Sequence, residues 1–175
     1  MADPLRFDEL ITDPVQLDQH SGQQPGQQLA RGVSRHLAAL GFATLDEFVP
    51  VRGLRVDVVG LGPKGEIWVV ECKSSRRDFL SDNKWQGYLQ WCDRYFWAVD
   101  LTFPTDLLPK DSGLILADDY DAEVVRMAPE HKLAAPRRKK VIQKFARDAA
   151  RRLHRLKDPR PGRNGQLFTD PPQRG

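Results

Sequence analysis

Apolar residues follow two different spacings along the chain, and each spacing predicts one kind of element. Three stretches rich in Val, Ile, Leu and Phe predict β-strands, namely ATLDEFVPV (43–51), LRVDVVGL (54–61) and EIWVVECKSS (66–75). The turn sequence Gly62-Pro63-Lys64-Gly65 separates the last two stretches. We therefore expect these two strands to form a hairpin, with Pro63-Lys64-Gly65 as its loop and a positive φ at Gly65.

Helical spacing predicts two further elements. In QQLARGVSRHLAALGF (27–42), apolar residues fall on one helical face and Gly41 suits the C-terminal end. In SDNKWQGYLQWCDR (81–94), apolar residues again recur at helical spacing, and Ser81 and Asp82 are alternative N-terminal caps. The apolar positions of the two helices are Leu29, Val33, Leu37 and Leu40, and Trp85, Tyr88, Leu89 and Cys92.

The remaining pattern completes a mixed α/β domain. YFWAVD (95–100) predicts a fourth strand, and GLILAD (113–118) and EVVRMA (123–128) predict a hairpin around an acidic turn. The order is helix, three strands, helix, strand and hairpin. We divide the chain into a flexible leader (1–26), a central domain (27–135), a basic helix (136–158) and a disordered tail (159–175).

The segment PRRKKVIQKFARDAARRLHRLK predicts one long amphipathic helix. Its apolar stripe is expected to dock on the core, with a basic cluster on the opposite face. The stripe consists of Ile142, Phe145, Ala149, Leu153 and Leu156. The basic cluster consists of Lys140, Lys144, Arg147, Arg151 and Arg155. Ten Lys and Arg stand against one Asp in residues 137–157, which favours contact with a polyanion over a merely solvated face.

Charge is distributed unevenly along the chain. The formal net charge of +3 combines a leader at −4, a central part (27–135) at −3 and a C-terminal part (136–175) at +10. No apolar run is long enough to cross a membrane, and the N-terminal residues lack the features of a secretory signal. The two cysteines and four histidines are scattered, so we expect neither a disulfide framework nor a zinc site, and a cytoplasmic location.

Three charged residues stand at unusual positions in the predicted hairpin. A loop centred on Lys64 sets Asp57 opposite Glu71, and Glu71 and Lys73, two residues apart, share a face of the strand. Two adjacent carboxylates repel each other unless a cation lies between them. Lys73 offsets one charge, and a divalent ion such as Mg²⁺ would offset the rest. The plainer interpretation is a surface ion pair on a half-exposed ribbon; the placement of Asp57 between valines favours a functional site.

These residues resemble the signature of the PD-(D/E)xK nuclease superfamily in its D…ExK form. The wider stretch VRGLRVDVVGLGPKGEIWVVECKSSRRDFLSDNKWQGYLQWCDRYFWAV is similar to the MmcB-like family of bacterial DNA-repair proteins. The resemblance implies a restriction-endonuclease-like αβββαβ core with a mixed central sheet. It implies that Asp57, Glu71 and the carbonyl of Cys72 hold Mg²⁺ or Mn²⁺, and that Lys73 serves the attacking water or the phosphate.

The resemblance also suggests supporting residues and has one important gap. A helix after the third strand often contributes a Gln or Lys, for which Gln86, Lys84 and Gln90 are the candidates. The first helix lacks the glutamate that many members of the superfamily use as a further ligand, and Glu47 is the nearest substitute. This gap leaves both a one-metal and a two-metal site open.

The function we expect is metal-dependent DNA cleavage in repair. The basic side chains expected to contact DNA are Arg76, Arg77, Arg137, Arg138, Lys140, Lys144, Arg147 and Arg151. Recognition would depend on DNA structure or damage, or on a repair-protein partner, in the bacterial nucleoid. The alternatives are a DNA-binding scaffold that cuts poorly or not at all, and a regulator that uses the basic helix on a membrane or a protein.

Overall fold

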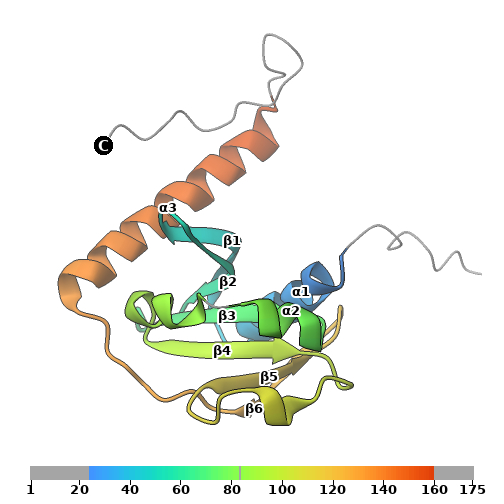
Figure 1. Cartoon of the computed structure of the whole chain (residues 1–175). Helices are drawn as coiled ribbons and strands as arrows, with labels where there is room; N and C mark the ends of the chain where they lie inside the picture. The colour runs from blue at the N-terminus through green and yellow to red at the C-terminus, as the bar shows by residue number, and fades with distance from the viewer. Residues whose placement is uncertain (1–23, 83, 160–175) are drawn as a thin grey trace, which may run out of the picture.

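Six strands form one mixed sheet whose spatial order, β1 to β6, follows the chain (Figure 1). The structure is a computed structural model that describes residues 24–82 and 84–159. Neighbouring strands are antiparallel except for β3–β4 and β4–β5, which are parallel. The strands are β1 (Ala43–Val51), β2 (Leu54–Leu61), β3 (Ile67–Lys73), β4 (Arg94–Val99), β5 (Gly113–Ala117) and β6 (Ala122–Arg126). The expected mixed α/β layout is confirmed.

In the part of the chain that the structure describes, three helices accompany the sheet, together with three short 3₁₀ turns. The helices are α1 (Pro25–Ala39), α2 (Arg76–Ser81) and α3 (Ala135–Lys157), and the turns are η1 (Trp85–Gly87), η2 (Leu89–Trp91) and η3 (Thr105–Leu107). The leader up to residue 23 and the tail from residue 160 lie outside the described residues. Among the described helices, none has both the length and the apolar character needed to cross a lipid bilayer.

The β2–β3 hairpin has the predicted loop. The Gly62 N–H donates to the Glu66 carbonyl at 2.8 Å, which leaves Pro63-Lys64-Gly65 as the three loop residues. Gly65 has a φ of 80°, in the left-handed region that glycine enters at little cost. The loop fixes the register, with Val58 opposite Val70 and Leu61 opposite Ile67.

Helix α1 covers one face of the sheet. Its buried residues Leu29, Val33 and Leu37 pack in one cluster with Val58 and Val70 of the central strands. Gly32 allows the close approach of α1 to the β5–β6 turn, because a Cβ there would lie 2.1 Å from the Asp118 carbonyl oxygen. The opposite face is covered by α2, the turns η1 and η2 and the first half of α3 (Figure 1).

The single helix predicted over 81–94 is wrong. The chain instead forms α2, capped by the Ser75 hydroxyl, which accepts a hydrogen bond from the Asp78 N–H, and then two 3₁₀ turns. Asp82, a suggested N-terminal cap, is extended and ends α2, with its carboxylate bound to Lys73. The apolar side chains still face the core, since Tyr88 and Cys92 are buried although the backbone around them is not a single helix. Helical spacing therefore identified the buried face and not the backbone.

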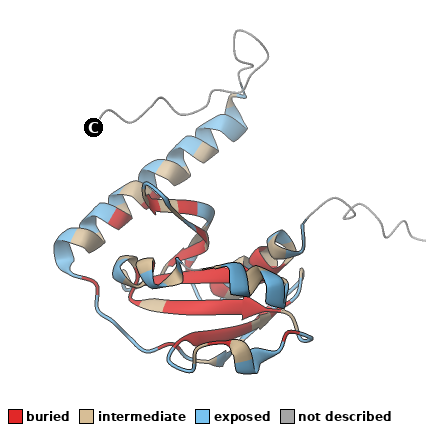
Figure 2. Cartoon of the chain, viewed as in Figure 1, coloured by how far each residue is buried: buried red, intermediate tan, exposed pale blue. Residues whose placement is uncertain are grey.

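Helix α3 contacts the core only through its first half. Val141 and Phe145 are buried, whereas Leu153 and Leu156 are 51% and 80% exposed. The helix runs past the sheet, and its outer half extends away from it (Figure 2). The expectation that the whole apolar stripe docks on the core is therefore wrong for the outer half, where Leu153 and Leu156 are exposed and a polar contact joins Arg152 to the Glu47 carbonyl of β1.

Candidate functional site

The site begins where β2 and β3 run side by side. Continuing the register from Val58 opposite Val70 sets Asp57 opposite Glu71, as the sequence predicted. The Oδ2 atom of Asp57 accepts a hydrogen bond from the Cys72 N–H at 2.7 Å, so its carboxylate closes the end of the ladder. The Cys72 side chain is buried in the cluster beneath α1.

Lys73 lies among two carboxylates and an aromatic ring. Its Nζ atom is 3.6 Å from Glu71 Oε1 and 2.7 Å from Asp82 Oδ2. It also lies 5.7 Å from the centre of the Trp97 ring on the neighbouring strand β4. The Glu71 and Lys73 side chains are only 8% and 7% exposed, which contradicts the plainer interpretation of a surface ion pair.

Burial and mutual repulsion favour the protonated forms of the two acids. Burial and the nearby Asp57 carboxylate raise the pKa of Glu71 to about 8, against the weaker pull of Lys73. Burial likewise raises the pKa of Asp57, although the Cys72 N–H opposes it. For Lys73, burial lowers the pKa, but the hydrogen bond to Asp82 and the charge of Glu71 outweigh burial and raise it overall. A cation between the carboxylates would relieve this repulsion.

One oxygen of the site has no partner. Glu71 Oε2 is buried and accepts no hydrogen bond, a costly arrangement for a carboxylate. An orphaned acidic oxygen beside a second carboxylate fits the ligand preference of Mg²⁺ or Mn²⁺. Within residues 24–82 and 84–159, however, no group of three or more His, Cys, Asp or Glu side chains is placed to hold a metal ion. The protein side chains therefore offer two carboxylates and not a full cage.

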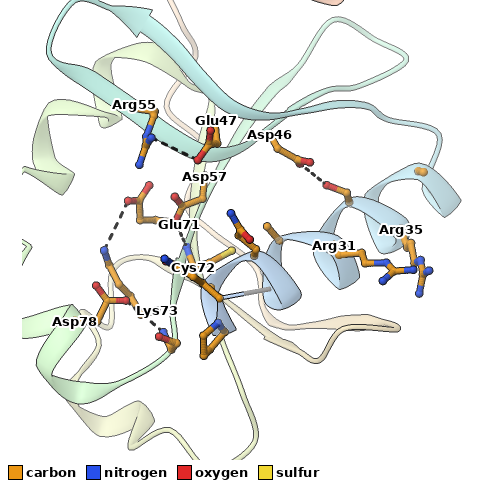
Figure 3. Close-up of a pocket in the computed structure, with 18 of the residues that line it drawn as sticks. Arg31, Arg35, Asp46, Glu47, Arg55, Asp57, Glu71, Cys72, Lys73 and Asp78 are labelled. Atoms are coloured by element: carbon orange, nitrogen blue, oxygen red, sulfur yellow. Dashed lines mark hydrogen bonds and ion pairs between the residues drawn. The ribbon is translucent and has the colours of Figure 1, made fainter. Parts of the chain in front are cut away.

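Two cavities meet at the carboxylate pair. The larger, of about 1070 Å³, lies between α1 and the ends of the strands, and Arg31 and Arg55 line it (Figure 3). Arg152 lines it as well. The smaller, of about 410 Å³, is lined by Asp82, Lys84 and Tyr88 among others. Asp57 and Glu71 line both cavities, so they are reachable from two sides.

Glu47 lies on the same row of the sheet as the two acids. Asp46 pairs with Val58 and Phe48 with Val56, so Glu47 stands opposite Asp57. Its φ of 48° is in the left-handed region, and its Oε1 atom lies 3.4 Å from a guanidinium nitrogen of Arg55 in the cavity wall (Figure 3). Glu47 is thus beside the site, paired with an arginine.

Of the three candidates after the third strand, one lines a cavity of the site and two do not. Lys84 lines the smaller cavity. Gln86 and Gln90 belong to separate 3₁₀ turns, are exposed, and line neither cavity. The single helix that was expected to carry these candidates does not form, because the segment folds into two 3₁₀ turns.

The basic residues expected to contact DNA divide into two groups. Five are exposed, namely Arg76, Arg77, Lys140, Arg147 and Arg151. The other three are half-buried and engaged within the fold. Arg138 donates two hydrogen bonds to the Asp93 carboxylate, and Arg137 donates to the Gln90 carbonyl. Lys144 and Arg151 both pair with Asp148.

Sequence reasoning missed Asp82 and Arg152. Asp82 binds Lys73 across nine residues, and Arg152 reaches the larger cavity and donates to the Glu47 carbonyl at 3.4 Å. Both contacts join separate elements, so no local pattern could have indicated them.

Comparisons with known proteins agree with this architecture. The family model "DNA repair protein MmcB-like" matches residues 15–160. The chain belongs to this family. A solved structure of the SPO1766 protein of unknown function from Silicibacter pomeroyi is similar to the MmcB-like chain, with 72% sequence identity and a TM-score of 0.78. That similarity covers 79% of this chain and 94% of the other. Among curated proteins, none matches.

The MmcB-like match spans every residue of the site described above, from Glu47 to Arg152. The family's name refers to DNA repair and to no reaction. The geometry of the two carboxylates and the lysine is therefore what bears on their chemistry.

Proposed function

We propose that this MmcB-like protein is a divalent-metal-dependent DNA endonuclease with a restriction-endonuclease-like core. One observation carries the proposal. Asp57 and Glu71 meet on neighbouring strands beside the buried ammonium of Lys73, and one Glu71 oxygen is left without a partner. Two carboxylates and a lysine at the edge of an open cavity suit hydrolysis of a phosphodiester.

Each residue has a distinct part in the proposed reaction. Asp57, Glu71 and the main-chain carbonyl of Cys72 would hold Mg²⁺ or Mn²⁺, which when bound activates water and offsets charge on the phosphate. Lys73 donates an N–H to the attacking water or to a phosphate oxygen. Water adds to phosphorus as the bond to one sugar oxygen breaks, leaving a phosphate on one DNA end and a hydroxyl on the other.

DNA contact is proposed to rely on exposed basic side chains. Arg76 and Arg77 begin α2 directly after the site, and Arg147 lies on the exposed side of α3. Such side chains bind the phosphate backbone of any sequence. We infer that the protein selects DNA by structure or damage, or through a partner, since none of these residues forms a module that reads base edges.

A binding scaffold that does not cut is the second candidate. It is favoured by the side-chain count at the site, since the described residues offer no third acid to hold an ion. In this case the basic surface would still bind DNA, and the carboxylate pair would have no catalytic use.

A cleavage assay separates the two candidates. The full chain is incubated with nicked, branched and single-stranded DNA in Mg²⁺ or Mn²⁺, beside Glu71→Gln, Lys73→Ala and the control Glu123→Gln on edge strand β6. The nuclease proposal expects cleavage by the wild type and the control, and a loss of about 100-fold or more in each site variant. Cleavage that survives both site substitutions contradicts it, and binding without cleavage by any form favours the scaffold.

A further inference from the structure

A third carboxylate completes the surroundings of Lys73, and it comes from outside the two strands that carry the site. Asp82 Oδ2 lies 2.7 Å from Lys73 Nζ, closer than Glu71 Oε1 at 3.6 Å. Both members of the Asp82–Lys73 pair are at least nine-tenths buried, at 10% and 7% exposure of their side chains. The nearest counter-ion of Lys73 is therefore Asp82.

This arrangement engages one N–H donor of the Lys73 ammonium group and leaves others available for further hydrogen bonds. An ammonium group has three N–H donors. Asp82 takes one at hydrogen-bond distance, whereas the Glu71 contact is longer than a hydrogen bond. The same nitrogen lies over the Trp97 ring, 5.7 Å from its centre. The ammonium is thus held in place while a donor can still turn toward the Asp57–Glu71 pair.

Asp82 is itself held by its neighbours. Its Oδ1 atom accepts a hydrogen bond from the Lys84 N–H at 2.9 Å, so each carboxylate oxygen has a separate partner. The residue ends α2 in an extended conformation and lines the smaller cavity that reaches Asp57 and Glu71. With both oxygens engaged, the Asp82 carboxylate can define the position of the flexible Lys73 side chain.

We propose that Asp82 is the positioning residue of Lys73, whose ammonium group it holds in place beside the carboxylate pair. This inference rests on the proposed nuclease function for its effect on rate, and on geometry alone for its effect on the lysine. A merely structural ion pair would close α2 against β3 and leave the placement of the Lys73 ammonium without consequence for the reaction.

Asp78 provides a matched control on the same helix. It bears the same charge and acts on Lys73 only through a more distant charge, and its own hydrogen bond is with the Ser74 N–H at 3.4 Å. Asp78→Asn therefore removes one negative charge near the lysine without removing its direct partner. Asp82→Asn removes the partner, and Asp82→Glu keeps the charge while moving it.

The experiment measures three properties of each full-length variant. The first two are the single-turnover cleavage rate at saturating DNA and the DNA affinity. The third needs no cleavage: an amine-reactive reagent labels the native protein, and mass spectrometry gives the labelling rate of Lys73. We expect Asp82→Asn to lower the cleavage rate by about 10- to 100-fold, as misplacement of a reacting group does. We also expect unchanged DNA affinity, several-fold faster labelling of Lys73, and partial recovery in Asp82→Glu.

The outcomes separate this inference from the proposed function. If Asp82→Asn labels Lys73 no faster than Asp78→Asn does, Asp82 does not hold the lysine and the inference is overturned, whether or not the wild type cuts DNA. If the wild type cuts no DNA while labelling rises only in Asp82→Asn, the nuclease proposal fails and the hold on Lys73 stands. If Asp82→Asn does not fold, Asp82→Glu decides: a slower rate at a native melting temperature supports the inference, and an unchanged rate overturns it.

Discussion

The carboxylate of Asp93 binds the guanidinium of Arg138 through two hydrogen bonds of 2.6 and 2.8 Å, and this pair fastens α3 to the sheet. The same carboxylate accepts the N–H of Ile67, the first residue of β3, and that of Leu133, just before α3. Asp93 is 3% exposed. Although burial alone would raise its pKa, these partners outweigh burial and lower it.

Breaking this pair should destabilise the whole domain. We expect Asp93→Asn to lower the free energy of unfolding by about 3–5 kcal/mol, because the Arg138 guanidinium loses its buried partner. Urea unfolding followed by circular dichroism measures the loss. The exposed Asp106→Asn serves as the control, and an equal effect of both substitutions would show that the Asp93 pair contributes nothing beyond general charge.

The site should make stability depend on pH in an unusual direction. Glu71 has a pKa of about 8 in the fold and 4.5 as its ordinary value. The native state therefore binds more protons than the unfolded state between these values, so this group's stabilising contribution is complete below about pH 4.5 and is lost as pH rises through 8. Glu71→Gln should remove that loss, which appears as a melting temperature above that of the wild type at pH 9 and close to it at pH 5. A wild type and variant that differ equally at both pH values would contradict this account.

Divalent cations should counter the loss of stability that deprotonation of Glu71 causes at high pH. Mn²⁺ can bind the deprotonated Asp57–Glu71 pair and competes with protons for it, so its stabilising effect should grow with pH. Thermal unfolding of the wild type at pH 5.5 and 8.5, with and without Mn²⁺, measures this difference. We expect the shift at pH 8.5 to vanish in Glu71→Gln; a shift that persists in this variant places the ion elsewhere.

The two halves of α3 should differ sharply in how much they contribute to the free energy of unfolding. Phe145 is 7% exposed and packs against Phe48, with ring centres 6.3 Å apart. Phe145→Ala should cost about 3–5 kcal/mol in denaturant unfolding. Leu156→Ala, at an 80% exposed position, should stay within about 0.5 kcal/mol of the wild type. Similar losses in both variants would mean that the outer half is packed in solution.

Exposed basic residues of α3 should govern the salt dependence of DNA binding. If Arg147 contacts a phosphate, Arg147→Gln should reduce the slope of log affinity against log salt by about 0.9. Lys110→Gln, an exposed residue in the loop before β5, is the matched control. Fluorescence anisotropy with labelled DNA over a range of salt concentrations gives both slopes, and equal slopes for the two variants would argue against a role for this face of α3.

The sequence predicted most of the sheet because its strands carry their own signals. Strands β1 and β2 have the predicted bounds, and the glycine-containing loop at residues 62–66 fixed the register that brings Asp57 to Glu71. A loop and an alternation of faces are both local properties. The placement of Asp57 opposite Glu71 therefore follows from the sequence alone.

Prediction failed where the outcome depends on contacts between distant segments. The apolar spacing of residues 85–92 is helical, yet the extended backbone at Asp82 and its bond to Lys73 end α2 before that segment. The apolar stripe of α3 is continuous in sequence, but only residues of the first half of the helix, such as Phe145, are buried against the core. The run of basic residues at the start of α3 likewise gave no sign that Arg138 pairs with Asp93.

The outer half of α3 also sets a length scale. From Phe145, its last buried residue, to Lys157 the helix rises about 18 Å, at 1.5 Å for each residue. Because a helix is stiff and this one is packed on the sheet at Phe145, any partner bound at its C-terminal end would lie at a set span from Asp57 on β2 and Glu71 on β3. Adding or removing a full turn beyond Arg152 would change that span without moving any residue of the site, so the reach of the helix and the reactivity of the site can be altered separately.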